Sequence, residues 1–204
     1  MIDKSLISED YTFTTFDKLG NEVAMGGRIV ETAYQVAEHF LNCPNAPVQY
    51  AAAYLGKNNI QIRDGSIQRS WDDATNDPNY GIVCATFVSF TLWQSGLIDE
   101  ATIDKYSYHG CSGVINILED PKYAQEWQRI DNWSELREGD IVVDSDHTYI
   151  YMDGDKMLDQ HYCVLTSTGD DYRGTLGTAS MKTFIEGKDR PGRGYRYIGK
   201  KLGE

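Results

Sequence analysis

Hydrophobic residues follow a helical spacing in the N-terminal part of the chain and alternate one by one near its end. The first clear helical stretch is "RIVETAYQVAEHFL", residues 28–41, in which Ile29, Ala33 and Phe40 recur at intervals typical of one helix face. The prolines of the following "NCPNAP" cannot continue a helix. The pattern therefore predicts an amphipathic helix over residues 28–41.

A second helix is predicted to begin near Cys84, in the segment "GIVCATFVSFTLWQSG". Val88 and Leu92 share one side of this helix with other apolar residues, which indicates an amphipathic element. Gly96 is suited to the left-handed conformation that ends many helices, and Leu97 can then pack against the last turn. The sequence thus places a cysteine at the start of a packed helix.

Two further segments carry weaker local signals. Residues 57–80 are rich in Asn, Asp and Gly, and they are predicted to form a loop with a short hairpin at Asp64-Gly65. The stretch "CSGVINILEDPKYAQEWQ" predicts two short helices, capped by Ser112 and by Asp120 with Pro121 at the first helical position.

The pattern changes to a period of two after Trp133. "IVVDS", residues 141–145, predicts a strand, and "HTYIYMDGDKMLDQHYCVL", residues 147–165, predicts a hairpin around an Asp-Gly turn. "YRYIG", residues 195–199, predicts a further strand. Helices followed by antiparallel strands indicate an α+β fold.

Length and composition bound the function. The chain has 204 residues, 41% hydrophobic and 25% charged, which is typical of one globular domain. We expect an N-terminal arm or linker at residues 1–27 and one domain at 28–204. The formal net charge of -12 argues against a nucleic-acid partner. No apolar stretch is long enough to span a membrane, and the first twenty residues lack the pattern of a secretory signal.

The cysteines are widely spaced and form no Cys-x-x-Cys pair, at positions Cys43, Cys84, Cys111 and Cys163. Their even number permits two disulfides, but a chain of this length does not require them, so we expect mostly reduced thiols. No zinc spacing is present, and "DSDH" and "DGDK" do not fit the calcium-binding loop of an EF-hand. The sequence predicts neither a metal nor a cofactor.

Cys84 has one of the two features that activate a thiol. The exposed N–H groups of a helix N-terminus favour an anion, and a neighbouring imidazolium favours it further. His147 begins the predicted hairpin, so it is the candidate for the second feature.

The register of that hairpin decides which residue orients His147. A three-residue loop places His161 opposite His147 and Asp159 diagonal to it on the same face. A two-residue loop instead places Gln160 opposite His147. The residues alone leave Asp159, Gln160 and His161 as alternatives.

Three blocks of sequence taken in order, "YGIVCATFVSFTLWQSGLID", "NWSELREGDIVV" and "HTYIYMDGDKMLD", resemble the NlpC-like and CHAP-type cysteine peptidases and amidases. These are papain-like enzymes that cut peptidoglycan peptides. The resemblance covers about residues 28–198, and it rests on the nucleophile pattern, the strand start and the hairpin: Cys84, Phe87, Val88, Leu136, Gly139, Asp140, His147 and Asp159.

The resemblance implies a papain-like fold, with N-terminal helices packed on a C-terminal antiparallel sheet. It implies acyl transfer with Cys84 as nucleophile, His147 as base and Asp159 as the third catalytic residue. A tyrosine upstream of the cysteine often contacts the substrate in this family, and Tyr50 and Tyr80 are the candidates here. The expected partners are peptidoglycan peptides, met at the bacterial cell wall after release or delivery of the protein.

Other interpretations stay open at this level. Cys84 can be a buried small hydrophobe, and Cys111 in "HGCSGVI", beside His109, is a rival nucleophile. The same fold also serves deamidases, transglutaminases and acyltransferases that modify a protein or lipid. A non-catalytic module that binds wall glycans is the third possibility.

Overall fold

The computed structural model describes residues 21–41, 43, 65–77, 82–106, 110–144, 147–152, 156–159, 177–180 and 192–199. Within these residues all helices except one 3-10 turn precede all strands, and every strand pairing is antiparallel. The fold is therefore α+β, as the change of hydrophobic period predicts. None of the described helices is long and apolar enough to cross a membrane.

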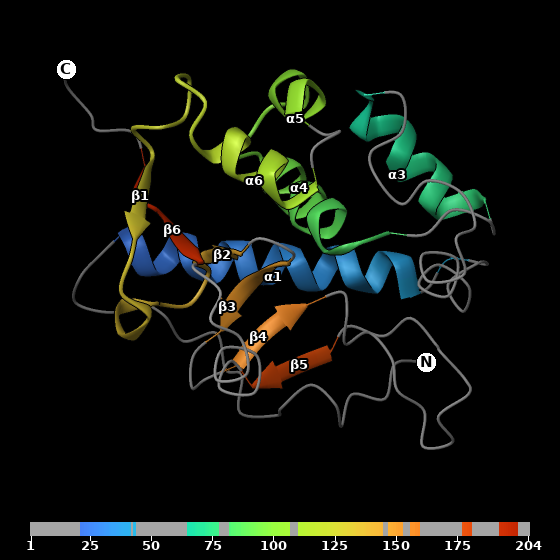
Figure 1. Ribbon diagram of the computed structural model, residues 1–204. Helices are drawn as coiled ribbons and strands as arrows, with labels where there is room; N and C mark the ends of the chain where they lie inside the picture. Colours follow the sequence, from blue (N-terminus) through green and yellow to red (C-terminus); the bar gives the residue numbers. More distant parts are fainter. Residues whose placement is uncertain are drawn as a thin grey trace.

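Helices make up the N-terminal part of the described chain (Figure 1). They are α1 (Asn21–Leu41), α3 (Ile67–Asn76), α4 (Cys84–Gln94), α5 (Glu100–Tyr106) and α6 (Gly110–Leu118). The strands that follow are β1 (Trp127–Ile130), β2 (Ile141–Val143), β3 (Thr148–Met152), β4 (Lys156–Asp159), β5 (Gly177–Ser180) and β6 (Arg193–Tyr197). They form one six-stranded sheet in the order β1-β6-β2-β3-β4-β5.

Helix α4 lies at the centre of the helical layer. Every residue from 85 to 92 is buried, so the helix is enclosed on all sides and is not the amphipathic element that its spacing predicts. Its hydroxyl residues bond within the helix, as Thr91 does by donating to the Phe87 carbonyl over 3.0 Å. Gly96 has φ +71° and Leu97 is buried, which confirms the predicted helix end.

The two faces of the sheet contact different clusters. Ile141, Val143 and Ile150 pack into the main core with the helices, whereas Val142 and Tyr149 pack on the opposite face. The second cluster is completed by residues around the 3-10 turn at 133–135. Successive strand residues point to opposite faces of the sheet, so the two-residue period of the sequence appears as alternate packing into the two clusters.

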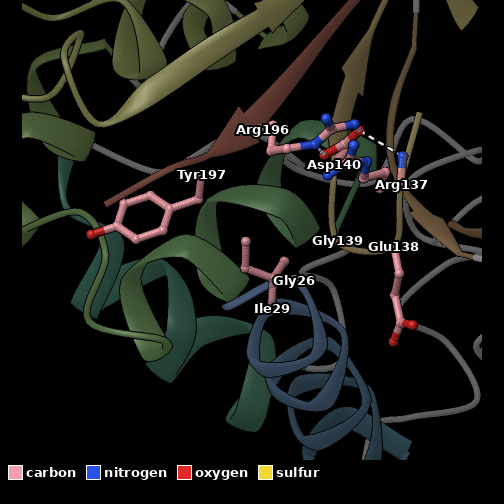
Figure 2. Close-up of a pocket in the computed structure, with 8 residues that line it drawn as sticks. All are labelled: Gly26, Ile29, Arg137, Glu138, Gly139, Asp140, Arg196 and Tyr197. Atoms are coloured by element: carbon pink, nitrogen blue, oxygen red, sulfur yellow. Dashed lines mark hydrogen bonds and ion pairs between the residues drawn. The ribbon is translucent and has the colours of Figure 1, made fainter. Parts of the chain in front are cut away.

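The Leu-x-x-Gly-Asp block has a structural role, because it joins α1 to the sheet (Figure 2). Gly139 has φ +83°, and a Cβ added there would meet the Cα of Gly26 on α1 at 2.3 Å. Asp140 accepts two hydrogen bonds from the guanidinium of Arg196, at 3.0 and 2.7 Å. The two side chains are only 1% and 10% exposed, so this is a buried, bidentate ion pair.

We expect Asp140→Asn to lower the free energy of unfolding by about 3–5 kcal/mol, because it leaves the buried Arg196 guanidinium without its counter-charge. Urea unfolding followed by far-ultraviolet circular dichroism measures this change.

The exposed pair of Arg129 and Asp131, joined at 2.6 Å, is the matched control. Its side chains are 48% and 71% exposed, and Asp131→Asn is expected to cost less than about 1 kcal/mol. Equal costs for the two replacements would contradict an anchoring role for Asp140.

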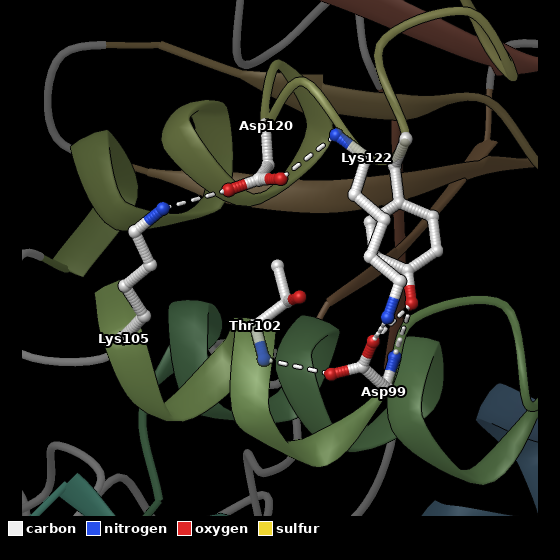
Figure 3. A network of polar contacts seen from close by, with 6 residues as sticks. Asp99, Thr102, Lys105, Asp120 and Lys122 are labelled. Atoms are coloured by element: carbon white, nitrogen blue, oxygen red, sulfur yellow. Dashed lines mark hydrogen bonds and ion pairs between the residues drawn. The ribbon is translucent and has the colours of Figure 1, made fainter.

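Two carboxylates tie α5 to the turns at residues 121–126 (Figure 3). Asp99 caps α5 by accepting from the Thr102 N–H at 2.9 Å, and it also pairs with Lys122. The hydrogen bond from Lys122, followed by one from Tyr123, lowers the pKa of the Asp99 carboxyl. Asp120 accepts from the Lys105 ammonium at 3.0 Å. These contacts hold α5 beside the C-terminal end of α6.

Two local predictions are wrong. Residues 67–76 are not a loop but form α3. The helix forms because Ile67 and Ala74 lie two turns apart on one side of it and are buried against the core. Ser66 caps the helix by accepting a hydrogen bond from the Arg69 N–H. The second short helix predicted near Asp120 is absent, since residues 121–126 form turns and Trp127–Ile130 form β1. Pairing of β1 with β6 overrides the local helix signals there.

The first helix begins at Asn21, seven residues before the predicted start at residue 28. The end of the expected arm, residues 1–27, therefore belongs to α1, where Gly26 packs against Gly139. Residues 1–20 lie outside the described part of the chain.

The register of the β3–β4 hairpin matches the three-residue loop. Ile150 pairs with Leu158, and Met152 pairs with Lys156. This is the pairing that a three-residue loop between the strands predicts, while Gln160 and His161 lie outside the described residues. The described pairs of β3 and β4 do not have the register of a two-residue loop.

Candidate active site

Cys84 is the first residue of α4, which confirms the predicted helix start. The first backbone bond of the helix runs from the Phe87 N–H to the Val83 carbonyl at 2.9 Å. The amides before Phe87 thus point out of the N-terminal end, where the helix dipole favours negative charge. Cys84 is half-buried.

His147 is held by the turn between β2 and β3. Its backbone N–H donates to the Asp144 carboxylate at 2.7 Å, and its carbonyl accepts from the Asp144 N–H at 2.8 Å. The next residue, Thr148, begins β3 and donates its hydroxyl to the Val142 carbonyl at 2.9 Å. The histidine is 6% exposed and its ring lies 6.0 Å from that of Tyr149.

The Cys84 thiol contacts groups from two distant parts of the chain. The His147 side chain and the Thr148 backbone lie within hydrogen-bonding reach of it. The Cys111 sulfur, from α6, also lies 4.0 Å from the Cys84 sulfur. The fold therefore brings together a helix N-terminus, an imidazole and a second thiol.

These neighbours change the acidity of the thiol. The hydrogen bond with Cys111 is the largest influence that lowers the pKa of Cys84, and the hydrogen bond and positive charge of His147 lower it further. The Thr148 N–H acts in the same direction, while desolvation opposes all three. The pKa of Cys84 ends well below its ordinary value, which favours the thiolate.

A thiolate and imidazolium in contact can perform nucleophilic acyl transfer. The thiolate attacks an electrophilic carbonyl, and the imidazolium supplies a proton to the leaving group. Backbone N–H groups at the start of α4 are suited to stabilise the oxyanion that forms.

The other predicted site residues are only partly described. Asp159 ends β4 and pairs with Gly177 of β5, but its side chain lies outside the described part. Gln160, His161 and both predicted substrate tyrosines, Tyr50 and Tyr80, also lie outside it, as does His109.

Sequence reasoning missed two residues that shape this site. Asp144 fixes the backbone of His147, and Thr148 directs its N–H at the Cys84 sulfur. Asp144 opens the "DSDH" segment, and an aspartate that bonds to the backbone a few residues later is a known turn signal. Thr148 acts through its backbone, for which the sequence carries no signal.

Other candidate ligands serve packing. The His39 ring stacks on Trp71 with centroids 4.4 Å apart and is within 2.9 Å of the Thr75 hydroxyl. The Cys43 thiol donates to the His39 carbonyl at 3.1 Å. Among the described side chains, no three His, Cys, Asp or Glu residues form a group that could hold a metal ion.

Two cavities lie elsewhere in the described structure. One of about 50 Å³ is lined by residues around Gly26 and Asp140 (Figure 2), and the other, of about 540 Å³, by residues around Trp93 and Asp99. Neither is lined by Cys84 or His147. The case for an active site rests on the thiol and its neighbours.

No protein-family model, curated protein or solved structure matches the chain.

Proposed function

We propose that this protein is a papain-like cysteine hydrolase that cleaves a peptide or amide bond in peptidoglycan through an acyl-enzyme. Cys84 is the nucleophile, His147 the general base and acid, and Asp159 the residue that orients His147. The reaction needs no metal or cofactor.

One observation carries this proposal: the His147 side chain lies within hydrogen-bonding reach of the Cys84 thiol, and the pKa of that thiol is lowered well below its ordinary value. A cysteine that only fills space has no need of an imidazole, and burial alone would raise its pKa. The contact joins the two residues that the sequence blocks single out, although one comes from the helical layer and the other from the sheet.

The proposed steps follow the chemistry of those groups. The Cys84 thiolate adds to the carbonyl carbon of the scissile amide, and α4 backbone N–H groups with the Thr148 N–H nearby favour the developing negative charge. His147 gives its proton to the leaving amine, and the acyl group remains on Cys84 as a thioester. His147 then takes a proton from water, which attacks the thioester and restores the thiol.

The substrate class rests on the three ordered sequence blocks that resemble wall peptidases and amidases. The papain-like arrangement is consistent with helices packed on an antiparallel sheet, with the nucleophile on a helix and the base at a strand. Asp159 is our candidate for the third position because it follows Leu158, the partner of Ile150, at the end of β4 that adjoins the start of β3.

The test is digestion of purified sacculi under reducing conditions. We expect the protein to release fragments that carry new amine and carboxyl ends, identified by mass spectrometry of the soluble products. The same protein alkylated at Cys84 is the matched control and is expected to release none.

Two results would contradict the substrate class. Sacculi that stay intact while a small amide or thioester probe still acylates Cys84 would favour a deamidase or acyltransferase acting on another polymer. Sacculi that bind the protein but leave Cys84 unreactive would favour a binding module.

A further inference from the structure

The sulfurs of Cys84 and Cys111 are close enough for the two residues to be considered as a disulfide-forming pair. Cys84 and Cys111 are 27 residues apart in the chain, yet their sulfurs lie 4.0 Å from each other. A disulfide needs a sulfur–sulfur distance of about 2 Å, so side-chain rotation has to bring them about 2 Å closer. Both residues sit in the first turns of adjacent helices, α4 and α6, whose N-termini bring the two side chains together.

We propose that Cys84 and Cys111 form a reversible disulfide when the protein meets a hydroperoxide, and that Cys111 thereby protects the nucleophile from irreversible oxidation. The disulfide is a modification site in its own right. Its effect on hydrolysis, a reversible inactivation, rests on the proposed function.

Three properties of the pair support this chemistry. Both residues are half-buried, so neither is fully enclosed by the core. The lowered pKa of Cys84 supplies the thiolate that attacks peroxide at neutral pH. The neighbouring Cys111 thiol has the position of a resolving cysteine.

The reaction balances with the peroxide as the sole oxidant. The Cys84 thiolate attacks one peroxide oxygen, the O–O bond breaks, and a sulfenic acid and hydroxide form. The Cys111 sulfur then attacks the sulfenic sulfur, the S–O bond breaks, and water leaves as the S–S bond forms. In total the two thiols lose two electrons and two protons, and the peroxide becomes two waters.

A metal is the other common reason for two cysteines and a histidine to meet. Within the described residues, the side chains form no group of three ligands that could hold an ion. In the reduced state, a hydrogen bond between the two thiols explains why the sulfurs are in contact, since either thiol can donate to the other. Cys111 is thus a hydrogen-bond partner of Cys84 in the reduced protein and forms a disulfide with Cys84 in the oxidised protein.

The experiment uses the full chain with Cys43 and Cys163 both replaced by serine, so that one pair of thiols remains. Treatment with a few equivalents of hydrogen peroxide is expected to remove two hydrogen atoms from the intact mass. Peptide mapping without reductant is expected to recover one cross-linked species joining residues 84 and 111. Dithiothreitol is expected to restore the original mass.

The matched variant adds Cys111→Ser, which keeps a hydroxyl that can donate to Cys84 but cannot form a disulfide. We expect this variant to gain two or three oxygen atoms on Cys84 and to recover less than about a tenth of its own starting activity with dithiothreitol. The parent is expected to recover nearly all of its activity.

Two outcomes would overturn the inference: no cross-linked peptide in the parent, or equal over-oxidation of Cys84 in both proteins. The mass readout needs no substrate, so it separates this inference from the proposed function. A cross-link that forms in a protein without hydrolase activity would leave the disulfide intact and remove only its regulatory meaning.

Discussion

Cys84→Ala is expected to lower the rate of amine release from sacculi by at least about 1000-fold, the scale on which acyl-transfer enzymes lose activity without their nucleophile. The physical reason is that Cys84 is the proposed nucleophile beside His147, so its removal leaves the imidazole without the thiol that it activates. His147→Ala is expected to lower the rate by about 100-fold or more, because the thiol loses its base and the leaving amine loses its acid. The initial rate of new amine ends, measured under reducing conditions, reports both effects.

The rival nucleophile is tested by the same assay. Cys111→Ala removes the hydrogen-bond partner of Cys84, whereas Cys111→Ser keeps a donor there. We expect the serine variant to be the more active of the two. Full activity in Cys84→Ala together with none in Cys111→Ser would instead identify Cys111 as the nucleophile. Cys43→Ser, at a thiol that bonds to the His39 carbonyl away from this chemistry, controls for the loss of a cysteine.

The second large effect is the alkylation of Cys84 by iodoacetamide in mild acid. An unperturbed thiol with a pKa near 8.5 is only about 0.3% ionised at about pH 6. The pKa of Cys84 is lowered first by Cys111 and then by His147, so its thiolate persists as the pH falls toward that lowered value. We expect Cys84 to react at about pH 6 at least about 30-fold faster than an unperturbed thiol.

Cys43 is the internal control for this measurement. It is 9% exposed, and burial raises the pKa of its thiol, so it is expected to stay unmodified across the same pH range. Intact mass and peptide mapping at a series of pH values give the rate at each cysteine.

Variants of His147 and Cys111 test whether each residue lowers the pKa of Cys84. His147→Ala and Cys111→Ala each remove an influence that lowers the pKa, so each is expected to move the midpoint of the alkylation curve of Cys84 to higher pH. A midpoint that stays at the value of an ordinary thiol in the parent protein would remove the basis of the proposed mechanism.

Helix α3 shows how tertiary packing overrides composition. "SIQRSWDDATN" is polar enough to be interpreted as loop, yet Ile67, Ser70 and Ala74 are buried along one side. Their spacing of three and four is a helical signal, but it rests on few apolar residues. Burial against α5 and the aromatic cluster around Trp71 supplies the stabilisation that the sequence pattern lacks.

Strand β1 was missed for a related reason. "WQRI" is buried at its two ends and exposed between them, which gives four residues too little alternation to identify a strand. Its pairing with β6 forms from residues near the end of the chain, with Trp127 opposite Tyr197. A partner so distant in sequence leaves no local pattern.

The sequence by itself determined the features that local physics controls. The helix that begins at Cys84 and ends before Gly96, the order of helices before strands and the existence of the 147–159 hairpin all follow from spacing and turn residues. Only the tertiary structure decided the hairpin register, the contact between Cys84 and His147 and the approach of Cys111 to 4.0 Å. These depend on how α4 and α6 pack against the sheet, because contacts between distant segments are fixed by the burial of whole faces and not by the residues beside them.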